Sequence, residues 1–421
     1  MSFNSTGEAL IGGVAVKASG ASFEAWDPAA RAHIAPSFQT VDADQIDQAC
    51  RLAAAAFDTY RATTDAQRAD FLDTIAEQIL AIGDDLIVRA MTESGLPRVR
   101  LEGERGRTVG QLKLFAGLLR EGSWTDARLD TALPDRTPPR PDLRLRMIGL
   151  GPVAVFGASN FPLAFSVAGG DTASALAARG AAIAAGFAGS LTMGVGQFCT
   201  NPGLVLGLEG PEFTAFAAAA AEALAPAPAA TMLTAGIASS YVKGVANLAQ
   251  HADVKPLLQN TGEEGKGAAA LFVTSGEAFL AKHDLRDEVF GPVSLLVACR
   301  DIAQLVEITE SLEGQLTATL QMDQGDLEDA RRLLPALERR VGRILANGFP
   351  TGVEVSTAMV HGGPFPATSD GRSTSVGTAA INRFLRPVSY QNLLQDLLPE
   401  SLRDGNPLGI WRRKDGVLGK E

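Results

Sequence analysis

The chain has 421 residues, of which 46% are hydrophobic and 20% charged, enough for two or three globular domains with ample core. Its formal net charge of -11, with no clustering of Lys and Arg, argues against a nucleic-acid partner. Cys50, Cys199 and Cys299 form no CxxC pair and the histidines no HExxH spacing, so neither a disulfide framework nor a metal site is predicted. With no signal peptide and no apolar run long enough to span a membrane, we expect a cytoplasmic protein.

The first third of the chain has the apolar spacing of amphipathic helices. Apolar residues recur at intervals of three and four, and short polar residues stand where caps would be. A Gly followed by a Pro marks one helix end. The predicted helices are one from Asp42 through Phe57, one capped by Thr64 or Asp65 and reaching Ile82, one from Asp84 to Gly95, and one over 111–119.

The remainder alternates between strand and helix patterns. Residues 134–141 form a Pro-rich connector, residues 143–147 alternate as in a half-exposed strand, and residues 151–157 have the apolar run of a buried parallel strand. This alternation predicts mostly parallel sheets with helical cover. The later elements are helices over 171–178 and 213–224, strands over 269–274, 293–298 and 316–321, a helix from Leu327 to Arg340 capped by Asp326 and kinked at Pro335, and a strand and turn over 383–394.

Cys199 is the strongest candidate for a nucleophile. It stands in Gly194-Val-Gly-Gln-Phe-Cys199-Thr-Asn-Pro-Gly203, between a Gly-rich approach and a turn signal. Backbone N–H groups on such a loop could lower the thiol pKa and stabilise an oxyanion. The alternative is a buried structural cysteine, because free Cys is among the most buried residue types. Cys50 and Cys299 fit that alternative better.

Two other segments hold candidate functional side chains. Asn160, in Gly157-Ala-Ser-Asn160-Phe-Pro, could donate to a developing oxyanion, although an ordinary turn Asn has the same pattern. Glu288, in Glu288-Val-Phe290-Gly-Pro, could accept hydrogen bonds from a sugar diol, although solvated loop acids are commoner.

Together these segments resemble the motifs of the NAD(P)-dependent aldehyde dehydrogenases, in character and order. The segments Glu93-Ser-Gly-Leu-Pro97 and Gly103-Glu-Arg-Gly-Arg107-Thr look like the matching helical part of that family. His361-Gly-Gly-Pro-Phe365-Pro-Ala-Thr and Arg383-Phe-Leu-Arg-Pro-Val388 are similar to the bacterial 2-oxoglutarate semialdehyde (2,5-dioxopentanoate) dehydrogenases. The resemblance runs from near residue 10 to the end.

The resemblance implies an aldehyde dehydrogenase-like α/β fold in three parts. A cofactor-binding domain would comprise 1–133 and 149–178, a catalytic domain 179–384, and a β oligomerisation arm 134–148 and 385–421. The arm implies a homo-oligomer, a dimer or tetramer. NAD or NADP would be the cofactor and a small-molecule aldehyde the substrate.

A thiohemiacetal mechanism is implied as well. Cys199 would attack the aldehyde, Asn160 and the Cys199 N–H would hold the oxyanion, hydride would pass to the nicotinamide, and a carboxylate-activated water would hydrolyse the thioester. The residues implied to bind the cofactor are Glu288, Phe290, Phe156 and Gly157. Phe365 would line the aldehyde tunnel. Arg105, Arg107 and Arg120 are candidates for binding a substrate carboxylate, although for each a surface or ion-pair arginine is the commoner case.

The sequence departs from the family near Ala178-Arg179. The family's cofactor-binding Lys, its Phe-Thr-Gly-Ser turn and the Glu-Leu-Gly segment with the general base are not found, so on the order of a hundred residues are missing, equivalent to several βα units. The dinucleotide-binding sheet is therefore expected to be truncated. Two other hypotheses stay open: a catalytically impaired pseudoenzyme, and a thiol esterase or acyltransferase that uses Cys199 without a cofactor.

Overall fold

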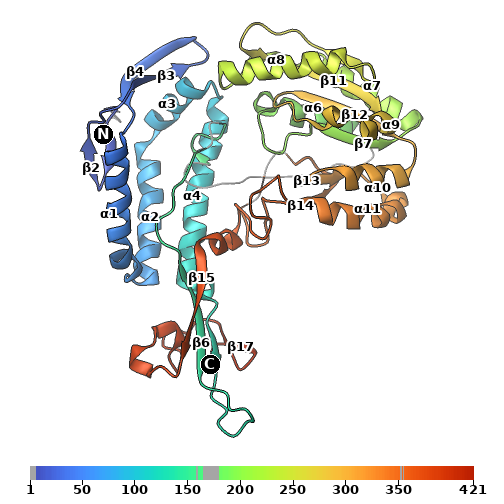
Figure 1. Cartoon of the computed structure of the whole chain (residues 1–421). Helices are drawn as coiled ribbons and strands as arrows, with labels where there is room; N and C mark the ends of the chain where they lie inside the picture. The colour runs from blue at the N-terminus through green and yellow to red at the C-terminus, as the bar shows by residue number, and fades with distance from the viewer. Residues whose placement is uncertain (1–5, 158–159, 165–179, 351–352, 354) are drawn as a thin grey trace.

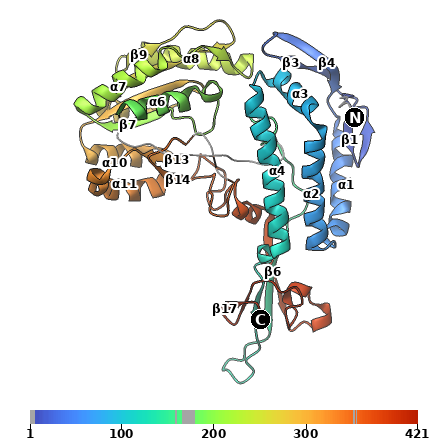
Figure 2. The ribbon, with the colours of Figure 1, turned by 180° about the vertical axis from the view of Figure 1, so that it is seen from behind.

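A computed structural model of the whole chain describes residues 6–157, 160–164, 180–350, 353 and 355–421. The fold is mixed α/β, as predicted. Figures 1 and 2 show an N-terminal helical region (blue to cyan), an α/β lobe (green to orange), and an arm of strands that projects away from both. The long helix α4 (Arg98–Glu121) stands between the other N-terminal helices and the lobe.

The N-terminal region confirms the predicted helices. The side chain of Asp42 caps the first, and Thr64 rather than Asp65 caps the second. Gly95 ends the third in the left-handed conformation that glycine tolerates best. Four short strands ahead of them were not predicted. The elements are β1 (Ala9–Ile11), β2 (Val14–Val16), β3 (Ser22–Asp27), β4 (Ala32–Gln39), α1 (Ala43–Arg61), α2 (Asp65–Ile82) and α3 (Asp84–Ser94).

The α/β lobe is built on a four-stranded sheet of order β7-β12-β11-β9, in which only β9 is antiparallel to its neighbour. A separate parallel pair joins β13 and β14, and β8 pairs with β10. The strands are β7 (Leu204–Leu208), β8 (Ala230–Thr231), β9 (Lys255–Gln259), β10 (Lys266–Gly267), β11 (Ala270–Ser275), β12 (Val293–Cys299), β13 (Gln315–Leu320) and β14 (Val341–Ala346). The helices are α6 (Gly180–Thr192), α7 (Pro211–Leu224), α8 (Ala235–Gln250), α9 (Gly276–Ala281), α10 (Ile302–Ser311) and α11 (Leu327–Arg340).

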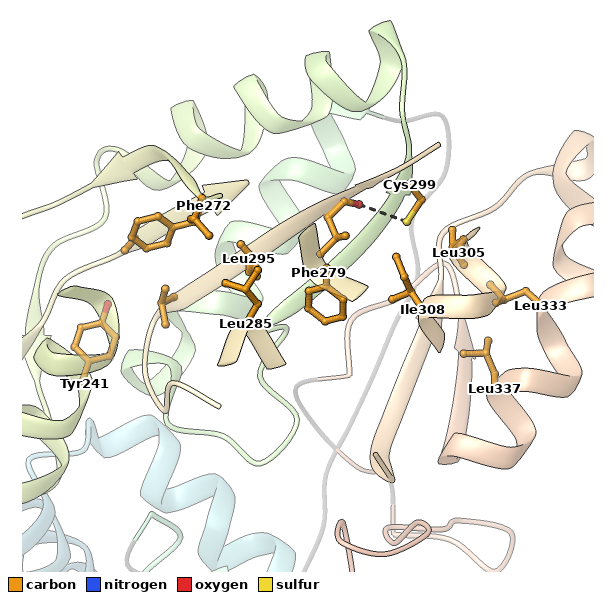
Figure 3. Close-up of a cluster of buried hydrophobic side chains, with 14 of the residues drawn as sticks. Tyr241, Phe272, Phe279, Leu285, Leu295, Cys299, Leu305, Ile308, Leu333 and Leu337 are labelled. Atoms are coloured by element: carbon orange, nitrogen blue, oxygen red, sulfur yellow. Dashed lines mark hydrogen bonds between the residues drawn. The ribbon is translucent and has the colours of Figure 1, made fainter. Parts of the chain in front are cut away.

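Both faces of this sheet are buried, as the apolar strand sequences predict. Successive side chains of a strand point to opposite faces, so Leu271 and Leu296 pack against α6 and α7, whereas Phe272 and Leu295 pack toward α8 and α9. Cys299 lies in the second of these clusters (Figure 3). Burial raises its pKa to about 11, so Cys299 is an inert core thiol, as its sequence context indicates.

The arm is a five-stranded sheet of order β15-β6-β5-β16-β17. Its longest pairing is antiparallel, between β6, the predicted alternating strand, and β15, the predicted C-terminal strand. A small core of Leu129, Leu398, Leu402 and Ile410 stabilises the arm. Its strands are β5 (Arg128–Asp130), β6 (Leu143–Gly149), β15 (Leu385–Gln391), β16 (Arg412–Lys414) and β17 (Val417–Gly419).

The predicted strand over 151–157 is wrong. These residues form no strand, and Val155 and Phe156 are 72% and 93% exposed. In the described part of the N-terminal region the only strand pairs are the antiparallel β1–β2 and β3–β4. A buried parallel strand needs neighbours on both sides, and without them this apolar sequence has no ladder to join. The helix predicted over 171–178 lies outside the described residues.

The capping prediction for α11 is also wrong in detail. The side chain of Asp326 makes no cap hydrogen bond to this helix and instead accepts one from the backbone N–H of Asp323, 2.7 Å away. The two aspartates form a capping box on the short 3₁₀ turn that precedes α11. Pro335 lies inside the helix, as predicted.

Candidate active site

The loop that presents Cys199 follows α6 and precedes β7. Three consecutive residues, Gly194, Val195 and Gly196, have positive φ angles of 54°, 59° and 65°, which is strained for a β-branched valine. A Cβ atom on Gly196 would lie 2.3 Å from the carbonyl carbon of Gly291, so only glycine fits there. The Gly-rich approach in the sequence therefore brings this loop against the Glu288-Val-Phe-Gly-Pro motif.

Hydrogen bonds after the cysteine fix the same loop on its other side. The amide of Asn201 donates to the carbonyl of Gly291 at 3.0 Å. The hydroxyl of Thr200 donates to the carbonyl of Pro350 at 2.7 Å. These two bonds tie the loop that holds Cys199 to the backbone at Gly291 and Pro350.

The thiol of Cys199 is paired with a histidine. Its Sγ lies 3.4 Å from Nε2 of His361, within hydrogen-bonding distance for sulfur. His361 is only 7% exposed, and its backbone N–H donates to the hydroxyl of Thr374 at 2.8 Å. The hydroxyl of Ser375 donates to the His361 carbonyl, also at 2.8 Å. Sequence reasoning singled out the His361 motif as a family signature but assigned the imidazole no role.

The electrostatics leave both members of this pair neutral at pH 7. Part of Cys199 is exposed to solvent, but its thiol is largely buried. This burial raises the pKa of the thiol above its ordinary value, against the opposing effects of its own N–H, Arg343 and Arg107. Burial, aided by Arg343 and Arg107, lowers the pKa of His361 to about 4. The pair is therefore a neutral thiol beside a neutral imidazole, whose Nε2 can accept the thiol proton in the tautomer that carries its own proton on Nδ1.

The depressed pKa of His361 predicts a loss of stability in acid. Between pH 6.5 and about pH 4 the unfolded chain binds a proton that the buried imidazole refuses, so the free energy of unfolding falls as the pH falls through this window. The expected loss is up to about 3 kcal/mol. Denaturant titrations at pH 7 and pH 4.5 will measure it. His361→Gln should lose less stability between the two pH values, and equal losses in both proteins would contradict the prediction.

Asn160 lies beside the cysteine loop. Its side-chain amide donates to the carbonyl of Gln197, two residues before Cys199, at 3.0 Å. Arg100 of α4 donates to the Asn160 carbonyl and lies over the rings of Phe161 and Phe198, 4.8 and 4.3 Å from their centres. The sequence motif thus places Asn160 next to Cys199.

A buried ion pair on α4 holds the segment that follows Asn160. Arg100 pairs with Glu104 at 3.2 Å, and the carboxylate of Glu104 also accepts from the N–H groups of Leu163 and Ala164, at 3.1 and 3.3 Å. Sequence reasoning matched part of this helix to the family but missed the pair. Its only local signal is the spacing of four residues between opposite charges.

Of the three arginines proposed for a substrate carboxylate, the structure brings one to the thiol. Arg107 is 7% exposed, and its charge acts on both Cys199 and His361. Arg105 donates to the carbonyl of Gly83 at 2.8 Å, and Arg120 bridges two acids of α2 on an exposed surface. Neither is brought to the cysteine. Arg343 of β14, which the sequence did not single out, is the second cation beside the thiol.

The proposed cofactor-binding residues divide into two groups. Glu288 is exposed and its charge acts on the thiol of Cys199, and Phe290 is half-buried in the turn before Gly291. Binding of the nicotinamide end of a dinucleotide by these two residues stays a prediction. Phe156 and Gly157 are exposed on the segment that forms no strand, so the described residues provide no sheet for the adenosine half. Phe365, proposed to line the aldehyde tunnel, is 80% exposed.

Known proteins similar to this chain decide the family. Residues 15–186 match the model of the aldehyde dehydrogenase family. Alpha-ketoglutaric semialdehyde dehydrogenase 2 of Azospirillum brasilense is 46% identical over 98% of this chain and 99% of its own length. The chain belongs to the aldehyde dehydrogenase family. Alpha-ketoglutaric semialdehyde dehydrogenase of Acinetobacter baylyi is a second aldehyde dehydrogenase relative, 42% identical over 90% of this chain and 93% of its own.

Solved aldehyde dehydrogenases share the fold. Aldehyde dehydrogenase 21 of Physcomitrella patens, solved in complex with the reaction product succinate, superposes with a TM-score of 0.74 at 14% identity. The match covers 93% of this chain and 99% of that one. HpcC of Thermus thermophilus matches with the same TM-score at 16% identity, over 93% of this chain and 94% of its own.

The alignment with the Azospirillum aldehyde dehydrogenase also reveals an internal gap. It extends over 521 positions, whereas this chain has 421 residues, so at least 100 aligned positions have no counterpart here. The family-model match ends at residue 186, just past the junction at Ala178-Arg179 where the sequence departs from the family. In the described part of this aldehyde dehydrogenase, no helix is long and apolar enough to cross a membrane, and no group of three His, Cys, Asp or Glu side chains could hold a metal ion.

Proposed function

We propose that this chain oxidises 2-oxoglutarate semialdehyde to 2-oxoglutarate, with Cys199 as the nucleophile and NAD or NADP as the hydride acceptor. The carrying observation is the Cys199 thiol held 3.4 Å from a neutral imidazole, with two guanidinium groups beside the pair. The names of the two bacterial relatives support this aldehyde as the substrate.

The first step is attack on the aldehyde carbon. As Cys199 Sγ forms its bond, Nε2 of His361 accepts the thiol proton, which the raised thiol pKa would otherwise retain at pH 7. The backbone N–H of Cys199 and the amide of Asn160 are the proposed donors to the oxyanion. Asn160 already donates one hydrogen bond to Gln197, which orients its amide beside the loop.

A bound nicotinamide would supply the hydride acceptor that conversion of the Cys199 thiohemiacetal into a thioester requires. Glu288 is the residue proposed to hold its ribose, with Phe290 beside it, and Phe156 and Gly157 are proposed to contact the rest of the cofactor. Because the gap removes the sheet that would carry the pyrophosphate and adenosine, this chain should bind the cofactor more weakly than its full-length relatives.

Arg107 and Arg343 are proposed to favour an anionic substrate. A cation beside the thiol attracts a negatively charged electrophile, so iodoacetate should react with Cys199 faster, relative to neutral iodoacetamide, than with a free thiol. Arg107→Met should reduce the iodoacetate-to-iodoacetamide rate ratio roughly fivefold to tenfold. Mass spectrometry of a Cys50→Ser background will measure it. Arg120→Met is the matched control from the same helix, and an equal loss in both variants would contradict the prediction.

The test of the function is cofactor reduction with 2-oxoglutarate semialdehyde and either NAD or NADP, at cofactor concentrations high enough to offset weak binding. Reduction of either cofactor, with formation of 2-oxoglutarate, supports the proposal. A folded protein that still alkylates at Cys199 but reduces neither cofactor would overturn it and favour the impaired pseudoenzyme.

Two coarser features belong to the same proposal. A homo-oligomer, a dimer or tetramer, is proposed through the five-stranded arm, which projects away from the rest of the chain (Figure 1). A cytoplasmic location is proposed because Cys50, Cys199 and Cys299 are all free thiols, which suits a reducing compartment.

A further inference from the structure

The thioester formed on Cys199 must be hydrolysed for turnover, and the segment with the family's general-base glutamate is absent from this chain. We propose that His361 is the general base that activates the hydrolytic water in this chain. This inference rests on the proposed function, because it assigns the second half-reaction at the same cysteine.

The imidazole of His361 lies close to the sulfur that would carry the acyl group. Nε2 of His361 lies 3.4 Å from Sγ, and the carbonyl carbon of an acyl group would be one covalent bond from that sulfur. A water that hydrogen-bonds to Nε2 therefore lies within reach of the carbonyl carbon, the geometry that general-base catalysis requires. Thr374 and Ser375 hold the backbone N–H and carbonyl of His361, which fixes the point from which its side chain reaches the sulfur.

The imidazole of His361 is unprotonated at neutral pH. The charged groups that act on His361 are Arg107 and Arg343, and together with burial they disfavour a protonated imidazole. His361 is therefore unprotonated throughout the neutral range, the state in which an imidazole can accept a proton from water. Because its pKa is about 4, it holds a proton only briefly and returns it readily to the departing sulfur.

The two carboxylates near the site, those of Glu104 and Glu288, are less well placed to activate a water at Cys199. Glu104 is committed to Arg100 and to two backbone N–H groups, so its lone pairs are used in the frame of the site. The charge of Glu288 acts on the Cys199 thiol, but the Glu288 side chain is exposed and is the one proposed to hold the nicotinamide ribose. Of these three groups, only His361 is both buried and in contact with the sulfur.

The step balances without another reactant. The water oxygen bonds to the thioester carbonyl carbon while one water proton moves to Nε2 of His361. The tetrahedral intermediate then breaks its C–S bond, and the proton on His361 moves to the sulfur that leaves. The products are a carboxylic acid, which ionises in water, and the Cys199 thiol.

The test forms the acyl-enzyme without aldehyde or cofactor, so its failure is distinct from failure of the dehydrogenase function. The Cys50→Ser chain and its His361→Gln variant, both as full chains, are acylated with 4-nitrophenyl acetate at alkaline pH, where the Cys199 thiol ionises without a base and the exposed Cys50 cannot react. The pH is then returned to neutral, and loss of the acetyl group from Cys199 is followed by intact-protein mass spectrometry. His251→Gln in the same background is the matched control, because His251 lies by Asp253 and Asp284 and not in the cysteine loop.

We expect His361→Gln to lose its acetyl group roughly 10²-fold or more slowly than the Cys50→Ser chain, and His251→Gln to match that chain. Hydroxylamine should release the acetyl group from His361→Gln, which shows that the group is held as a thioester. Hydrolysis by the Cys50→Ser chain should slow as the pH falls toward 4, and the His361→Gln variant should lack this dependence. Hydrolysis by His361→Gln at the rate of the Cys50→Ser chain would overturn the proposal. So would a persistent acetyl group in Glu288→Gln alone, because it would make Glu288 the base.

Discussion

Replacing Cys199 by alanine is expected to lower kcat for aldehyde oxidation by roughly 10⁴-fold or more, to the background of the assay. The thiol supplies the covalent bond from which hydride leaves, and neither His361 nor Asn160 can replace it, because each acts on atoms attached to that sulfur. Cofactor reduction and 2-oxoglutarate formation will measure the loss.

The matched control for this prediction is Cys50→Ala. Cys50 is an exposed residue of α1, so its removal should leave turnover intact and remove only background labelling by thiol reagents. Turnover that survives in Cys199→Ala but falls in Cys50→Ala would reverse the assignment of the nucleophile.

Local sequence signals predicted the elements of this fold well where the signal is itself local. The helices α1 and α2 begin at the polar caps expected from the sequence, and the apolar runs of β11 and β12 became buried strands. The residues 151–157 carry the same kind of signal and form no strand. The difference is not in these residues but in their missing neighbours, because hydrogen-bonding partners in a parallel sheet come from elsewhere in the chain.

The candidate site shows the same division between residues that a local motif reveals and contacts between residues far apart in the sequence. Motif resemblance led to Cys199, Asn160 and Glu288, and the structure brings the loops that hold them together. Motif resemblance did not reveal the chemistry of His361, which contacts the Cys199 thiol from 162 positions away in the sequence. A contact across that distance leaves no periodicity to detect, and without several sequences there is no covariation to reveal it.

Electrostatic partners were the hardest to predict. Three arginines of α4 gave three equal candidates, and of these only the charge of Arg107 acts on the thiol, whereas Arg105 and Arg120 are bonded to Gly83 and to acids of α2. Arg343 entered the site from β14, whose sequence carries no mark of function. The direction in which each arginine points is a property of tertiary packing, which sequence spacing alone does not determine.

The largest stability effect should come from the ion pair that holds the site. Arg100→Met is expected to reduce the free energy of unfolding by about 3–5 kcal/mol, because it leaves Glu104, only 5% exposed, without its cationic partner. It also removes a guanidinium that lies over the rings of Phe161 and Phe198. Denaturant titration at pH 7 will measure the change.

Arg98→Met is the matched control, from the same helix. Arg98 pairs with Asp84 and Glu102 at the surface, where removal of an ion pair costs about 1 kcal/mol or less. Adding Glu104→Gln to Arg100→Met should recover part of the lost stability, because the unpaired charge is then removed. If instead the second substitution costs as much as it does in the wild type, the buried carboxylate is not what destabilises Arg100→Met. The loss would then come from the stacking of Arg100 on the two rings, and the frame that holds Asn160 beside Cys199 would be an aromatic one.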